Sequence, residues 1–141
     1  MARRRLAAWL MALALGLGAS AQAETAPDWP RRFDNADGTQ TTLAAAPRRV
    51  LSTSVTVSGT LLAIEAPLVA SAGSANGRFF DQWAAVARER GLTPLWPAGQ
   101  VDLEAAYAAR PDLIIVSATG ADSAREQLDA LRAIAPVIVV D

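Results

Sequence analysis

The chain has 141 residues, a formal net charge of −1, and neither histidine nor cysteine. These absences exclude Ser-His and Cys-His nucleophiles, zinc sites built from the usual ligands, disulfides and redox dithiols. All of the cations are arginines, and three of them lie in the first five residues, so the rest of the chain is mildly acidic. An acidic balance argues against nucleic acid and against an anionic membrane as partners.

Residues 1–23 have the three parts of a secretory signal. Arg3, Arg4 and Arg5 form a positive start, residues 6–18 are apolar, and Ala21-Gln22-Ala23 is a small-x-small cleavage site. The apolar run of about 13 residues is shorter than the roughly 20 residues of a membrane span. We therefore expect a periplasmic protein of the Gram-negative type that does not span the membrane once the signal is removed. Sec and twin-arginine export both stay open.

The first elements after the signal are a flexible end and a hairpin. Residues 24–32 contain two prolines and predict a flexible mature terminus. Residues 33–43 predict a small β-hairpin, because Asp37-Gly38 suits its turn and the threonines that follow suit strand positions.

From residue 49 onward, strand patterns alternate with helix patterns. Such alternation predicts a parallel, doubly wound α/β sheet in one domain, residues 33–141. Ser123 and Glu126 have the spacing of a capping box at the start of the last helix. The expected strands are 50–54, 68–72, a short one at 95–96, 113–116 and 137–140; the expected helices are 56–66, 79–90, 103–109 and one that follows residue 123.

Polar loops follow three of the expected strands. In open α/β sheets, ligands lie outside the carboxyl ends of the strands. The loops offer hydroxyls, backbone amides, one arginine and aromatic rings, which suit a bulky polar or anionic aromatic ligand rather than a bare metal ion. The candidate binding residues are Ser52, Thr53, Ser54, Arg78, Phe79, Trp96, Ala118, Thr119 and Gly120.

Most of these residues also have plain structural explanations. Serine and threonine after a strand are commonly turn or cap residues, and the aromatic residues lie at helical core spacing. Asp122 and Ser123 are interpreted as helix caps. No pair of carboxylates stands out as catalytic.

Several segments together resemble a known family. They are PRRVLSTSVTVSGTLLAI (47–64), QWAAVARERGL (82–92), ARPDLIIVSATG (109–120), VSATGADS (116–123) and LRAIAPVIVVD (131–141). This order resembles the amino-terminal lobe of the periplasmic iron-siderophore binding proteins that serve ABC importers. Within that family the resemblance is strongest to the ferric enterobactin binding proteins.

The resemblance implies one Rossmann-like lobe of a two-lobed protein, with the second lobe absent from this sequence. It implies capture of a ferric catecholate siderophore and its delivery to an inner-membrane ABC permease. The siderophore satisfies the iron, so no cofactor and no metal ligand of the protein are expected. By matching position, Arg78 would meet the negative charge of the siderophore, Ser52, Thr53 and Ser54 would line the floor, and Ala118-Thr119-Gly120 would offer backbone contacts.

Three other hypotheses stay open. The ligand could be a hydroxamate siderophore, cobalamin or haem, although Tyr107 is the only candidate haem ligand. The chain could be a truncated lobe that binds nothing, or that pairs with another chain through an unfinished sheet edge after residue 140. An exported enzyme would need Ser54 or Ser117 as its nucleophile, and the chain supplies no histidine base.

Overall fold

The computed structural model describes residues 29–141, so the predicted export signal lies outside the described residues. A two-stranded antiparallel hairpin precedes a four-stranded parallel sheet. In chain order the elements are β1 (Arg31–Asp34), β2 (Gln40–Leu43), β3 (Val50–Ser52), α1 (Val55–Ala63), β4 (Leu68–Ser71), α2 (Asp81–Glu89), α3 (Leu103–Ala108), β5 (Leu113–Ser117), η1 (Arg125–Gln127), α4 (Leu128–Arg132) and β6 (Val137–Val140).

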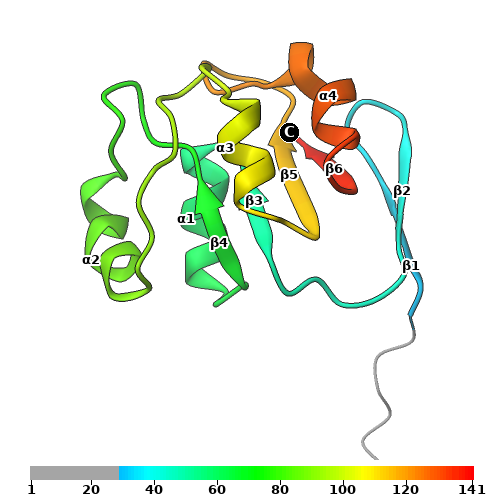
Figure 1. Ribbon diagram of the computed structural model, residues 1–141, viewed down its shortest axis with the longest axis horizontal. Helices are drawn as coiled ribbons and strands as arrows, with labels where there is room; N and C mark the ends of the chain where they lie inside the picture. Colours follow the sequence, from blue (N-terminus) through cyan, green and yellow to red (C-terminus); the bar gives the residue numbers. More distant parts are fainter. Residues whose placement is uncertain (1–28) are drawn as a thin grey trace, which may run out of the picture.

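The strand order across the sheet is β4-β3-β5-β6, and every pairing is parallel. The predicted doubly wound sheet and the hairpin before it are confirmed (Figure 1). Strands β3 and β5 are neighbours in space, although β4 lies between them in the chain. The chain therefore leaves β3 toward one side of the sheet and returns to build on the other, which creates a topological switch point between β3 and β5.

Strand β5 is buried on both faces, which explains its continuous apolar sequence. Ile114 and Val116 belong to a core cluster that includes residues of α3 and α4. Leu113 and Ile115 belong to a second cluster that includes residues of α1 and α2. The sheet is thus the middle layer of three, with two helices on each face.

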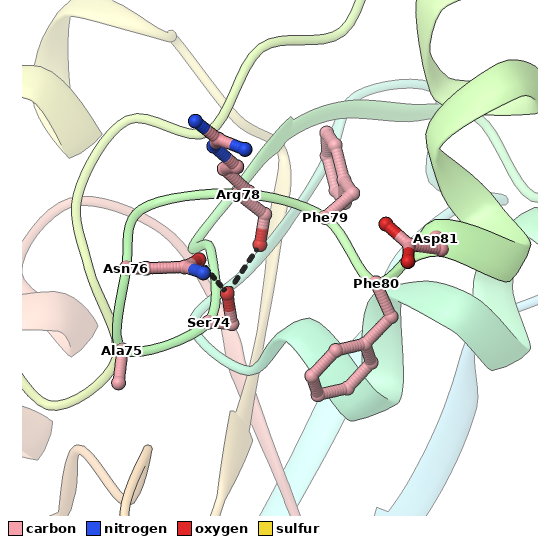
Figure 2. A pocket seen from close by; sticks show the side chains of 7 residues that line it. All are labelled: Ser74, Ala75, Asn76, Arg78, Phe79, Phe80 and Asp81. Carbon is pink, nitrogen blue, oxygen red and sulfur yellow. Dashed lines mark hydrogen bonds between the residues drawn. The ribbon is translucent and has the colours of Figure 1, made fainter.

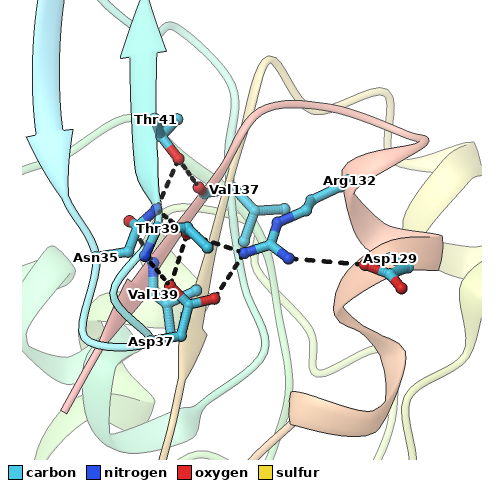
Figure 3. A network of polar contacts seen from close by, with 8 residues as sticks. All are labelled: Asn35, Asp37, Thr39, Thr41, Asp129, Arg132, Val137 and Val139. Carbon is cyan, nitrogen blue, oxygen red and sulfur yellow. Dashed lines mark hydrogen bonds and ion pairs between the residues drawn. The ribbon is translucent and has the colours of Figure 1, made fainter.

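The hairpin covers the outer edge of β6 (Figure 3). The backbone N–H of Ala36 donates to the carbonyl of Val139 at 2.9 Å, and the N–H of Val139 donates to the side-chain oxygen of Asn35 at 3.0 Å. The Thr41 hydroxyl donates to the carbonyl of Val137. The hairpin thus covers the edge through which the sequence predicted pairing with another chain.

The opposite edge, at β4, is covered by the chain that follows α2. Ser71 forms a single parallel bridge with Pro94, and the N–H of Leu95 donates to the Ser71 carbonyl at 2.8 Å. The short strand expected at residues 95–96 is therefore one bridge centred on Pro94, since a proline has no N–H with which to extend a ladder.

Two further expectations from the sequence are corrected. Strand β1 begins at Arg31, so the last two residues of the predicted flexible terminus form a strand paired with β2. Ser123 does not form a capping box, because its hydroxyl donates to the carbonyl of Ala118 at 3.1 Å. The chain there makes the 3₁₀ turn η1 before α4 begins at Leu128.

An ion pair joins the hairpin turn to α4. A guanidinium nitrogen of Arg132 lies 2.7 Å from a carboxylate oxygen of Asp37, whose side chain is only 12% exposed. Asp37 also accepts hydrogen bonds from the hydroxyl and the backbone N–H of Thr39. The hydrogen bonds from Thr39, followed by the contact with Arg132, lower the pKa of Asp37 from 3.8 to about 2.

We expect the Asp37→Asn variant to be less stable than the wild type at neutral pH. Since the pKa of Asp37 is lower in the folded than in the unfolded chain, its contribution is present above about pH 3.8 and is lost as the pH falls through about 2. Urea unfolding of both proteins over this range should show the difference shrinking with acid. A Glu89→Gln control, on an exposed side chain of α2, should show no such difference. A gap between wild type and Asp37→Asn that stays constant down to pH 2 would contradict this account.

Candidate ligand-binding site

A hollow of about 440 Å³ lies at the switch point, outside the carboxyl ends of the strands. The first turn of α1, the loop after β4 and the loop after β5 contribute to its wall. We call it the switch-point hollow; its lining residues are Val55, Thr56, Ser74, Ala75, Phe80, Ala98, Gly120, Ala121 and Asp122.

A second hollow, of about 510 Å³, lies beside the first. Figure 2 shows the residues that line the second hollow. The two share Ser74, Ala75 and Phe80, so they form adjacent parts of one surface. We call the second one the Arg78 hollow; its lining residues are Ser74, Ala75, Asn76, Arg78, Phe79, Phe80 and Asp81.

The backbone of Arg78 is fixed by Ser74. The carbonyl of Arg78 accepts a hydrogen bond from the backbone N–H of Ser74 and another from its hydroxyl, both at 2.8 Å. The turn between them has Gly77 in the left-handed region, with φ of +72°. The Arg78 side chain is exposed, and its guanidinium forms no ion pair within residues 29–141. Its charge is therefore available to a ligand.

Buried serines hold the start of α1 beneath the switch-point hollow. Ser54 caps α1, and its hydroxyl accepts from the N–H of Val57 at 3.3 Å. The carbonyl of Ser54 accepts hydrogen bonds from the hydroxyls of Ser52 and Ser58, each at 2.8 Å. These side chains are at most 1% exposed. They shape the loop from behind, and their hydroxyls are already used within the protein.

One side-chain contact joins the two loops at the switch point. The Ser54 hydroxyl donates to Oδ2 of Asp122, in the loop that follows β5. Asp122 is thus wrongly predicted as a helix cap: it lines the switch-point hollow and accepts its hydrogen bond from the loop after β3. The local sequence signal for this role is weak, since an aspartate after a glycine is also typical of turns.

The structure places the predicted site residues in three groups. Arg78, Phe79 and Gly120 line the hollows, and Ser54 contacts a lining residue. Thr119 is exposed but lies outside both linings. The remaining four are buried and line neither hollow: Ser52, Thr53, Trp96 and Ala118.

Two of the buried residues have specific reasons to lie away from a ligand. Trp96 is 4% exposed and packs in the core on the α3–α4 face of the sheet. The backbone of Ala118 is already engaged, because its N–H donates to the carbonyl of Val140 at 2.7 Å and its carbonyl accepts from Ser123. Both backbone groups of Ala118 thus already have a hydrogen-bond partner within the protein.

The sequence analysis did not identify Val55, Thr56, Ala98 or Ala121 as part of the site. These residues are small or medium in size and have no distinctive chemistry, so only the topology brings them together. Within residues 29–141, no three acidic, histidine or cysteine side chains gather in a way that could hold a metal ion. The same part of the chain has no helix long and apolar enough to cross a membrane.

Fold and site together define an α/β lobe with a ligand-sized surface at its switch point. Comparison with known proteins agrees with this class. No family model matches the chain. The ferric enterobactin-binding periplasmic protein FepB of Escherichia coli O6:H1 (strain CFT073) is 46% identical over 123 residues, which cover 82% of this chain and 38% of FepB.

Two solved structures extend the comparison. The crystal structure of holo-ViuP is 58% identical with a TM-score of 0.79 and covers 81% of this chain and 38% of ViuP. The periplasmic catecholate-siderophore binding protein VctP of Vibrio cholerae, at 24% identity and a TM-score of 0.63, shares the fold over 79% of this chain and 37% of VctP. The chain is therefore related to the periplasmic siderophore-binding proteins, as the resemblance predicted, and spans less than half of their length.

Proposed function

We propose that this chain is a ligand-binding lobe of a periplasmic protein that captures a ferric catecholate siderophore and delivers it to an inner-membrane ABC permease. The observation that carries the proposal is the pair of adjoining hollows at the switch point, one of them lined by Arg78, whose guanidinium forms no ion pair within residues 29–141. The names of relatives such as FepB support the same ligand class.

The chemistry of the site fits a ligand that brings its own iron chelation. A catecholate complex is anionic and aromatic, so a guanidinium and phenyl rings are suitable partners for it. Arg78 would contact the negative charge, and Phe79 and Phe80 would contact the rings. The iron is then part of the ligand, and the protein needs no coordinating residue.

We propose binding without turnover. Ser54, at the start of α1, is one of the two candidate nucleophiles. Its hydroxyl donates a hydrogen bond to the carboxylate of Asp122. The hydroxyl of Ser117, the other candidate, donates to the carbonyl of Thr119 at 2.8 Å. Neither serine has a histidine to activate it, since the chain contains none.

Haem is a poorer ligand for this surface. Tyr107, the candidate axial ligand, is 72% exposed on α3 and lines neither hollow. Hydroxamate siderophores lack the aromatic rings that Phe79 and Phe80 would contact. Catecholates are thus the class that uses both the charge and the aromatic surface.

Titration of the exported chain with three iron complexes tests the proposal. We expect ferric enterobactin to quench tryptophan fluorescence saturably at one ligand per chain. Ferrichrome, a hydroxamate complex, and haemin should bind at least about tenfold more weakly, a difference of ~1.4 kcal/mol. Tighter binding of ferrichrome or haemin, or no saturable binding of the catecholate, would contradict the proposal.

A further inference from the structure

Most arginines of residues 29–141 lie at one end of the molecule, the end at which the parallel strands begin. This end is opposite the two hollows, which lie outside the carboxyl ends of the strands (Figure 1). The segments that meet there are the start of β1, the loop before β3, the end of α2 and the turn before β5, and they contain seven of the ten arginines. We call this surface the basic end; its arginines are Arg31, Arg32, Arg48, Arg49, Arg88, Arg90 and Arg110.

Hydrogen bonds of two of these arginines hold the basic end together. The guanidinium of Arg49 donates to the carbonyls of Ala109 and Arg110, at 2.7 and 2.9 Å, in the turn before β5. The guanidinium of Arg90 donates to the carbonyl of Ala66, in the turn before β4, at 3.2 Å. These contacts bring the end of α2 and the loop before β3 to the starts of the strands.

Few carboxylates balance the charge of the basic end. Glu65, Glu89 and Asp112 are the acidic residues at this end of residues 29–141. Both carboxylate oxygens of Asp112 accept backbone N–H groups of the loop before β3, each at 2.8 Å. The ion pairs within residues 29–141 involve Arg132, so none of the seven arginines is paired there. The argument from total charge against an anionic membrane therefore does not apply to this end.

Two apolar side chains project from the same end. Ile64, directly after α1, is 67% exposed, and Tyr107, near the end of α3, is 72% exposed, which makes them the most exposed large hydrophobic residues of 29–141. Ile64 is two residues before the Ala66 carbonyl that Arg90 contacts, and the carbonyl of Tyr107 accepts from the N–H of Arg110 at 3.0 Å. Exposed apolar side chains among cations are typical of surfaces that lie on an anionic membrane.

We propose that the basic end is a docking surface for an anionic phospholipid membrane. The arginines attract the headgroup phosphates, and their spread over four segments fits an extended anionic surface. Ile64 and Tyr107 enter the boundary between the headgroups and the acyl chains. The two hollows take no part in this contact, so the inference goes beyond the proposed function and does not depend on it.

Co-sedimentation with lipid vesicles tests the proposal. The chain without its predicted export signal is mixed with vesicles of phosphatidylcholine alone, or with vesicles that also contain phosphatidylglycerol. We expect binding to the anionic vesicles only, and we expect it to weaken as salt is added, because salt screens the attraction. Equal binding to both kinds of vesicle, or no binding to the anionic ones, would overturn the proposal.

Single substitutions locate the contact. Arg48→Gln and Arg110→Gln each remove an exposed guanidinium of the basic end, and each should weaken binding to the anionic vesicles about fivefold. Arg125→Gln is the matched control, because Arg125 is exposed on η1, at the end that carries the hollows. This change should alter the binding less than about twofold. A loss in the control as large as in the other two variants would overturn the proposal.

Ile64→Ala separates a membrane from an acidic protein surface as the partner. Poly-glutamate serves as a soluble polyanion without acyl chains. We expect the substitution to weaken binding to the anionic vesicles at least about threefold, because the lost apolar surface leaves water only in lipid. Binding to poly-glutamate should stay the same. An unchanged ratio of the two affinities, or wild-type binding to poly-glutamate as tight as to the vesicles, would overturn the membrane assignment.

Discussion

Replacing Ile114 with alanine is expected to lower the free energy of unfolding by about 2–5 kcal/mol. Ile114 is fully buried in β5, opposite Leu51 of β3 and Val137 of β6. Strands on both sides fix its backbone, so the structure cannot collapse easily onto the space left by the lost atoms. Equilibrium unfolding in urea measures the change, and a loss below about 1 kcal/mol would contradict the central position assigned to β5.

Ile64→Ala is the matched control for this prediction. Ile64 follows α1 and is 67% exposed, so the same change of atoms removes little buried contact. We expect its effect to stay within about 0.5 kcal/mol. A loss as large as that of Ile114→Ala would mean that the exposed end of α1 is covered in solution.

Replacing Arg78 with alanine is expected to weaken the binding of a ferric catecholate by about 1–3 kcal/mol, roughly fivefold to 150-fold. Arg78 is the single cation among the residues that line the two hollows. The backbone carbonyl of Arg78 is held by hydrogen bonds from Ser74, and the Arg78 side chain takes no part in them. The substitution should therefore leave the loop from Ser74 to Arg78 in place. Fluorescence titration of the wild type and the variant measures the ratio of dissociation constants.

Arg88→Ala is the control for charge. Arg88 is exposed in the last turn of α2, the helix that begins just after Arg78 in the chain. It lines neither hollow. We expect its removal to change the affinity less than twofold. An Arg78→Ala variant that also stays within twofold of the wild type would rule out a role for Arg78 as a ligand contact.

The sequence predicted most of the fold because its patterns are local. The apolar run at 113–116 is long enough for a strand and too short for a helix, and prolines or glycines separate most of the elements. The last helix was less predictable. Ser123 has the spacing of a capping box, but its hydroxyl is used by the Ala118 carbonyl, a competition that sequence spacing does not reveal.

The candidate site was predicted in outline and not in detail. Parallel strands bring their following loops to one edge, and this rule located the loops that contain Arg78 and Gly120. Whether a residue in such a loop faces a hollow or the core depends on tertiary packing. Ser52 and Trp96 face the core, whereas Asp122 lines the switch-point hollow.

A single NMR experiment tests the central claim, namely that the two hollows bind the siderophore. The chain without its predicted export signal is labelled with ¹⁵N and titrated with the gallium complex of enterobactin, which replaces paramagnetic iron with a diamagnetic ion. We expect the amide shifts to concentrate at residues 54–56, 74–81 and 120–122. Shifts that gather instead around Arg49 and Arg110, at the opposite end of the sheet, would contradict the account, and so would a spectrum that the complex leaves unchanged.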